Sequence, residues 1–96
     1  MFIMKNMERE KITKTTFAPG EILSDGRHAF ITDGRGNADG LGVLIGFTSE
    51  NRLCRSSGVN NYCKSGKVYL PTKEEIEELF NAIRYEKDIP YYSCIP

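Results

Sequence analysis

The distribution of glycine divides this chain into two parts that cannot fold alike. All nine glycines lie between positions 20 and 66, whereas the sequence after Pro71 contains none and is rich in glutamate. Glycine destabilises helices and is common at turns, bulges and bends of strands. The first part therefore predicts short strands joined by turns, and the second predicts a helix. Because 96 residues suffice for one domain only, we expect a single α+β domain over residues 17–96, preceded by a flexible lead-in at residues 1–16.

The strongest strand signal is a predicted hairpin at residues 22–32. Asp25-Gly26 separates two apolar stretches, and such a pair is typical of a two-residue hairpin turn. In this register Ile22 faces Ala29. One face of the hairpin then carries Ile22, Ala29 and Ile31, and the other carries Leu23, His28 and Phe30. Apolar residues on both faces predict cover on both sides, as in a small barrel or in a sheet with a helix on top.

Further strands are predicted after a loop at residues 33–40. Residues 41–47 form a short apolar run, and Gly42 and Gly46 within it indicate a bulge or a sharp bend. Short strands are also expected at residues 52–55, 62–63 and 67–70. We therefore expect a small, strongly bent antiparallel sheet of about five strands, as in a small barrel.

The helix is predicted to begin after Thr72, because Thr72 and Glu75 have the spacing of a capping box. Four apolar residues then share one helical stripe that we expect to pack on the sheet: Ile76, Leu79, Phe80 and Ile83. Pro90 opposes a helical conformation at the residue before it. An extended apolar tail is therefore expected from about residue 89, and its Tyr91, Tyr92 and Ile95 are candidates for a partner interface.

Three cysteines and one histidine offer few ways to bind a metal. The chain has an odd number of cysteines, Cys54, Cys63 and Cys94, and it lacks a C-x-x-C pair. Neither a disulfide framework nor a zinc site is therefore expected. We expect Cys54 and Cys63 to be small buried side chains. We expect no metal and no cofactor. The chain also has no apolar run of the length needed to cross a membrane, and we expect it to be cytoplasmic.

Sequence patterns for catalysis fit poorly. The glycines at 34 and 36 lack the helix and spacing of a dinucleotide-binding loop, and the loop at 33–40 lacks the ligands of a calcium loop. His28 is expected to be a partly buried, hydrogen-bonded imidazole rather than a catalytic base. We therefore do not expect an enzyme.

Cationic side chains gather in the turns of the predicted sheet, interleaved with tyrosine. Guanidinium groups bind phosphate oxygens in pairs, and tyrosine rings stack on bases, so the set suits an anionic, nucleotide-like ligand. The candidate binding residues are Arg27, Arg35, Arg52, Arg55, Tyr62, Lys64 and Lys67. The net charge is +2 for residues 1–16, +1 for residues 17–70 and −3 for the remainder. Strong nonspecific nucleic-acid binding is therefore not expected.

Two segments carry a resemblance to a group of known proteins. Residues 17–23, Phe-Ala-Pro-Gly-Glu-Ile-Leu, and residues 69–80, Tyr-Leu-Pro-Thr-Lys-Glu-Glu-Ile-Glu-Glu-Leu-Phe, flank the predicted sheet. In this order the chain resembles small accessory proteins of phages and mobile elements in gut bacteria. The resemblance implies an SH3-like sheet with a C-terminal helix, an accessory role in the host cytoplasm, and no catalytic residues.

These observations favour a non-catalytic binding module that self-associates and sequesters an anionic, nucleotide-like signal of host defence. A second hypothesis is an inhibitor or adaptor that binds a host protein through the tail or the acidic helix. A third is a small enzyme that uses Cys54 or Cys63 with His28.

Overall fold

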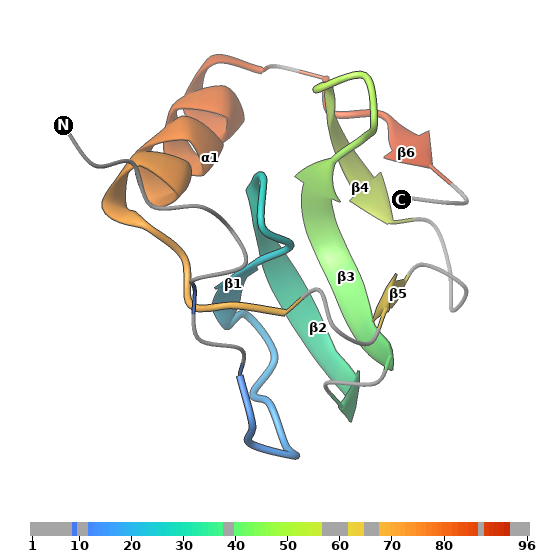
Figure 1. The fold of residues 1–96 in the computed structure, drawn as a ribbon. Helices are drawn as coiled ribbons and strands as arrows, with labels where there is room; N and C mark the ends of the chain where they lie inside the picture. The colour runs from blue at the N-terminus through green and yellow to red at the C-terminus, as the bar shows by residue number, and fades with distance from the viewer. Residues whose placement is uncertain are drawn as a thin grey trace, which may run out of the picture.

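The computed structural model describes residues 9, 12–37, 40–56, 62–64, 68–86 and 88–92 of the chain. It confirms an α+β domain in which one helix lies beside a sheet (Figure 1). The elements in chain order are β1 (Ile22–Ser24), β2 (Ala29–Asn37), β3 (Gly40–Phe47), β4 (Leu53–Ser56), β5 (Tyr62–Lys64), α1 (Lys73–Tyr85) and β6 (Tyr91–Tyr92).

The sheet is open, so the expected closed barrel is not found. Strands β1 to β4 run antiparallel in chain order, and β6 lies parallel to β4 at the far edge. Strand β5 pairs with the beginning of β3, on the same edge that β4 occupies further along. Among the described strands β1 and β6 do not pair with each other. The edge of β1 that faces away from β2 carries an isolated antiparallel bridge between Ser24 and Tyr69. This bridge is the part of the predicted strand at 67–70 that the structure contains.

The first hairpin differs from the predicted register. Four residues, 25–28, connect β1 to β2, and Ser24 pairs with Ala29. The carboxylate of Asp25 explains the wider turn, since its Oδ1 accepts hydrogen bonds from the backbone N–H groups of Arg27 and His28, both at 2.8 Å. The register differs by two residues, which leaves each strand residue on its predicted face. His28, however, belongs to the turn and lies on the helix side of the sheet.

A bulge at Leu44 changes the face of the sheet to which alternate residues of β3 point. Ile45 pairs with Ile31 and Val43 pairs with Thr32, so β3 has one residue more than β2 at this point. Val43 therefore faces away from α1, whereas Ile45 faces it. Leu44 is the extra residue, and its side chain is 49% exposed.

Two apolar clusters result, one on each face. The cluster beneath the helix contains Ala29, Ile45, Phe47, Leu53 and Leu79. The cluster on the opposite face contains Phe17, Leu23, Phe30, Leu41, Val43, Cys54 and Val68. The predicted cover on both sides of the first hairpin is thus confirmed, in the form of a sheet that carries a helix.

The predicted loop at 33–40 is largely strand. Strand β2 continues to Asn37 and β3 begins at Gly40, while residues 38 and 39 lie outside the described part of the chain. Gly34 and Gly36 have φ values of 86° and 85°, which side chains rarely tolerate. These two glycines allow β2 to bend and remain paired with β3.

Helix α1 confirms the predicted capping box, because the Thr72 side chain accepts from the Glu75 backbone N–H and the Glu75 carboxylate accepts from that of Thr72. Leu79 is completely buried. Phe80 was expected in the same stripe but is 44% exposed, because the face of α1 that packs on the sheet is the one that carries Leu79, Ala82 and Ile83. No helix within the described residues is long and apolar enough to span a membrane.

Both ends of the described chain lie against the domain. In the predicted lead-in, the Ile12 N–H donates to the Val68 carbonyl at 3.0 Å, and Arg9 forms an ion pair with Glu75. At the other end, β6 aligns Tyr91 with Arg55. The described part of the tail, which ends at Tyr92, therefore lies along its own sheet.

Candidate functional site

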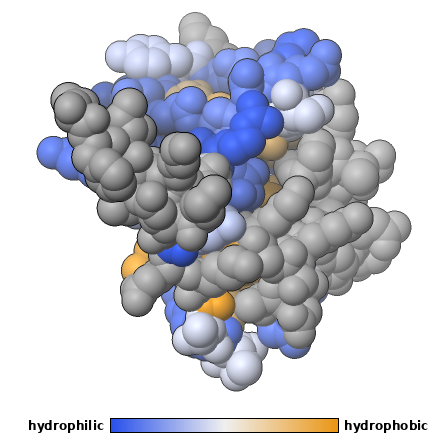
Figure 2. All heavy atoms as spheres, viewed as in Figure 1, coloured by the Kyte–Doolittle hydropathy of each residue, from blue (hydrophilic) through white to orange (hydrophobic). Residues whose placement is uncertain are grey.

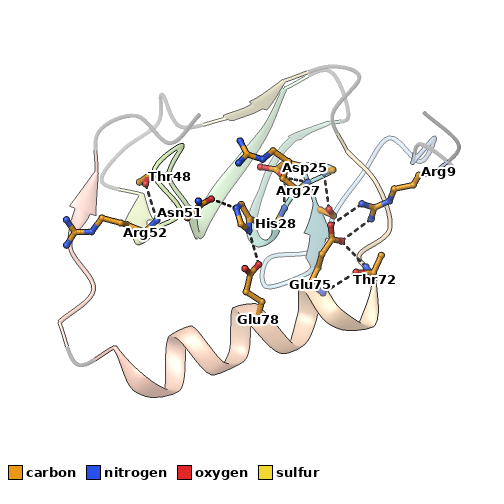
Figure 3. Close-up of polar contacts among 12 residues, drawn as sticks. Arg9, Asp25, Arg27, His28, Thr48, Asn51, Arg52, Thr72, Glu75 and Glu78 are labelled. Atoms are coloured by element: carbon orange, nitrogen blue, oxygen red, sulfur yellow. Dashed lines mark hydrogen bonds and ion pairs between the residues drawn. The ribbon is translucent and has the colours of Figure 1, made fainter. Parts of the chain in front are cut away.

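The candidate site is the end of the sheet where two turns meet helix α1. His28, in the β1–β2 turn, lies at its centre (Figure 3). Its Nδ1 is 2.8 Å from Oε1 of Glu78 on α1, and its Nε2 is 2.7 Å from Oδ1 of Asn51 in the β3–β4 turn. The ring also lies over Phe47, with 4.7 Å between the ring centroids. His28 thus connects three separate elements.

The β3–β4 turn has a fixed shape. The Thr48 hydroxyl accepts hydrogen bonds from the N–H groups of Glu50 and Arg52, and the Thr48 N–H donates to the Arg52 carbonyl at 2.8 Å. Asn51 has a φ of 63°, a left-handed conformation that asparagine accepts more readily than most residues. This conformation presents the Asn51 side chain to His28.

Several groups compete to set the charge on His28. Its side chain is only 15% exposed, and this burial is the largest single influence, which lowers its pKa. Hydrogen bonds to Glu78 and Asn51, together with the negative charges of Glu78 and Asp25, act in the opposite direction and outweigh burial. The pKa of His28 is therefore raised above its ordinary value of 6.5.

Arg27 and Arg52 flank this histidine. Arg27 precedes His28 and Arg52 follows Asn51, so the His28–Asn51 contact brings their backbones together at one end of the sheet. Both side chains are exposed, and Figure 3 shows both extending away from the ion pair of Arg9 and Glu75. Neither guanidinium has a hydrogen-bond or ion-pair partner within the part of the chain that the structure describes. The surface over the β3–β4 turn is hydrophilic (Figure 2).

Of the other predicted binding residues, Arg35 and Arg55 have described side chains, and these contact other parts of the protein. Arg35 lies toward the opposite end of β2, where its Nε and a terminal nitrogen donate to Asp33 at 2.8 and 2.6 Å. Arg55 donates from Nε to the Ile89 carbonyl at 3.0 Å. Strand β5, which carries Tyr62 and Lys64, pairs with residues 40–42 and is therefore also distant from the β3–β4 turn along β3. Their side chains, like Lys67 as a whole, lie outside the described residues.

Of the predicted partner interface, the structure describes only the backbone of Tyr91 and Tyr92. Tyr91 and Tyr92 form β6, whose side chains the structure does not describe, and Ile95 lies outside the described residues.

A second polar group of residues anchors the start of α1. The Arg9 guanidinium donates to both carboxylate oxygens of Glu75 at 3.0 Å and to the Leu70 carbonyl at 2.6 Å, and it lies 5.2 Å from the centroid of the Tyr69 ring. Each side chain of the ion pair is less than 15% exposed. The sequence contained no signal for this contact, because 66 residues separate its partners. It positions α1 rather than the candidate site.

Among the described residues, three carboxylates have a lowered pKa. A hydrogen bond from Lys14 is the main cause at Glu21. Burial alone would raise the pKa of Asp33 and of Glu75, but hydrogen bonds from Arg35 and Arg9, respectively, outweigh it.

Cys54 and His28 lie on opposite faces of the sheet. Cys54 belongs to the cluster remote from the helix and is buried as predicted, whereas the His28 ring packs on Phe47 of the other cluster. Burial raises the pKa of the Cys54 thiol, although the charge of Arg52 lowers it slightly. These two residues therefore do not form a thiolate–imidazole pair. The side chain of Cys63 is outside the description.

No cluster of three or more potential metal ligands occurs among the described histidine, cysteine and acidic residues. Comparison of the chain with protein-family models, curated proteins and solved structures gave no match. The resemblance to phage accessory proteins therefore stays a prediction.

Proposed function

We propose that this protein is a non-catalytic binding module that captures a phosphate-bearing, nucleotide-like anion at the end of the sheet formed by the turns at 25–28 and 48–52. Arg27 and Arg52 are the residues that hold the anion in this proposal. A guanidinium group can donate two parallel hydrogen bonds to phosphate oxygens, a geometry that lysine cannot provide.

The observation that carries the proposal is the sorting of the arginines by their contacts. Arg35 and Arg55 both donate to groups of the protein itself. Arg27 and Arg52 have exposed guanidiniums without such partners among the described residues, and they project from turns with fixed backbones. A cation on a preorganised turn loses less conformational freedom when it binds a ligand.

Binding is favoured over catalysis by the contacts of His28. Both of its ring nitrogens already face oxygen atoms of the protein, so neither is directed at a substrate. A general base must reach the proton that it abstracts.

Calorimetric titration tests the proposal. The panel consists of inorganic pyrophosphate, nucleoside diphosphates and nucleoside triphosphates, each added to the wild type, to the double variant Arg27→Ala/Arg52→Ala, and to Arg35→Ala. We expect binding of at least one phosphate compound by the wild type and by Arg35→Ala, and a loss of about tenfold or more in affinity in the double variant. Arg35→Ala is the matched control because it removes an arginine at the other end of β2. Absence of binding to the whole panel, or equal binding by the double variant, would refute the proposal.

Self-association in the host cytoplasm is part of the same proposal. Its support is the exposure of large apolar side chains, which include Leu44, Phe80 and Tyr85. Light scattering should report a species larger than the 10.9 kDa chain. A monomer at all concentrations would remove this part of the proposal and leave the anion site intact.

A further inference from the structure

Among the described residues, His28 is the one titratable group that joins all three elements of the candidate site. Glu78 approaches it from α1, Asn51 approaches it from the β3–β4 turn, and its own turn contributes Asp25. The remaining charged residues of these two turns are Arg27, Glu50 and Arg52. Groups of both signs thus surround an imidazole that is largely buried.

The two contacts of the ring require two protons. Glu78 Oε1 and Asn51 Oδ1 are both acceptors, and each lies within 2.8 Å of a ring nitrogen. A neutral imidazole carries one N–H group, whereas the imidazolium carries two. Loss of one proton would leave a nitrogen lone pair facing an oxygen lone pair, so that contact opens unless the Asn51 amide turns over and donates its N–H instead.

We propose that His28 is a proton-dependent latch, which ties the β1–β2 turn to both α1 and the β3–β4 turn when it is charged and releases one of them when it is neutral. His28 acts here as a positioning residue. The raised pKa of its ring agrees with this assignment, because the charged form is the one that the folded protein stabilises.

The latch also regulates anion capture, an inference that rests on the proposed function. Arg27 and Arg52 are the chain neighbours of the two latched residues, so the closed latch fixes the spacing of the backbone positions from which their side chains extend. The charged ring adds a third positive charge to the site. Affinity for a phosphate compound should therefore increase as the pH falls through the titration of His28.

Nuclear magnetic resonance tests the latch without any ligand. His28 is the only histidine of the chain, so its ring nitrogens give one set of signals. We expect both nitrogens to be protonated in the closed state, and the backbone amide signals of Asn51 and Glu78 to shift with the same midpoint as the ring. A neutral ring near pH 6 that accepts from the amide group of Asn51 would overturn the latch, as would amide signals that do not follow the ring.

Two variants open the latch in different ways. Glu78→Gln keeps an acceptor but removes its charge, and Asn51→Gly removes the amide while glycine readily adopts the φ of 63°. We expect both to lower the midpoint of the His28 titration. Glu77→Gln is the matched control, because it removes an exposed charge from the adjacent position of α1. A midpoint that shifts equally in Glu77→Gln would reduce the effect to general surface charge and overturn the latch.

Inorganic pyrophosphate serves as the probe for regulation. Its own protonation changes with pH, so the informative quantity is the ratio of its affinity for the wild type to that for His28→Gln, measured at each pH between 5.5 and 8. We expect this ratio to fall about fivefold as the pH rises, the lower end of typical coupling between sites. A constant ratio would overturn the regulatory inference. If pyrophosphate binds neither the wild type nor His28→Gln at any pH, the proposed function fails for this probe, and the proposed regulation of anion capture fails with it. The nuclear magnetic resonance result still decides whether the latch exists.

Discussion

Replacement of Leu79 by alanine should destabilise the domain more than any other single truncation on α1. Leu79 is completely buried within the apolar cluster beneath the helix, where it packs with residues of β2, β3 and β4. Leucine-to-alanine substitutions at such sites cost about 2–5 kcal/mol, because a cavity remains. A domain of this size has a total stability of about 5–15 kcal/mol.

Urea unfolding followed by circular dichroism measures this effect. A loss of about 3 kcal/mol, divided by a slope of about 1.5 kcal/mol per molar urea, moves the midpoint by about 2 M. Phe80→Ala is the matched control. Phe80 is the larger side chain, but it is 44% exposed, so we expect a loss of about 1 kcal/mol or less. An equal or larger loss for Phe80→Ala would mean that α1 presents a different face to the sheet, and the packing described above would be wrong.

Three further predictions concern the sheet and its titratable groups. The free energy of unfolding should be greatest between about pH 4.5 and 6.5. The pKa of His28 is raised, so its stabilising contribution is complete below 6.5 and is lost at higher pH, whereas Glu21, Asp33 and Glu75 have lowered pKa values, so their contribution is complete above 4.5 and is lost in acid. Unfolding measured at a series of pH values would contradict this if stability rose from pH 6 to 8. Gly36→Ala should lower the free energy of unfolding by about 2 kcal/mol or more, since φ is 85° and a Cβ would overlap the Gly40 carbonyl. Gly40→Ala is the control, because a Cβ there meets open space and should leave stability nearly unchanged. Equal unfolding midpoints for the two variants would argue against the bend in β2. Cys54, kept as the only cysteine, should react with a thiol reagent at neutral pH at least about tenfold more slowly in the folded than in the unfolded protein, and rapid alkylation of the folded form would revive the thiol-enzyme hypothesis.

Local sequence patterns predicted the helix and strands of this fold better than the turns and bulges that connect or bend them. Thr72 and Glu75 are three residues apart, so the cap they form can be recognised without knowledge of the rest of the chain. The Asp25-Gly26 pair suggested a two-residue turn, but the Asp25 carboxylate binds two N–H groups and lengthens it. The bulge at Leu44 was beyond prediction in its position, because Gly42 and Gly46 indicated only that the strand bends somewhere between them.

The candidate site was predicted in part. Arg27 and Arg52 were among the candidates, but the sequence contained nothing to distinguish them from Arg35. The hydrogen bonds that Arg35 donates to Asp33, two residues earlier, depend on the folded conformation of β2. The contacts of His28 join positions 23 and 50 residues apart, and such separations depend on the register of the sheet and on the placement of α1.

The place of β3 in both apolar clusters has a consequence for how the domain unfolds. One continuous strand supplies Leu41 and Val43 to one layer of side chains and Ile45 and Phe47 to the other. Unfolding of either apolar cluster therefore removes the side chains of β3 from the other cluster as well. The domain should therefore lose both layers in a single transition, with coincident denaturation curves from probes placed on either side.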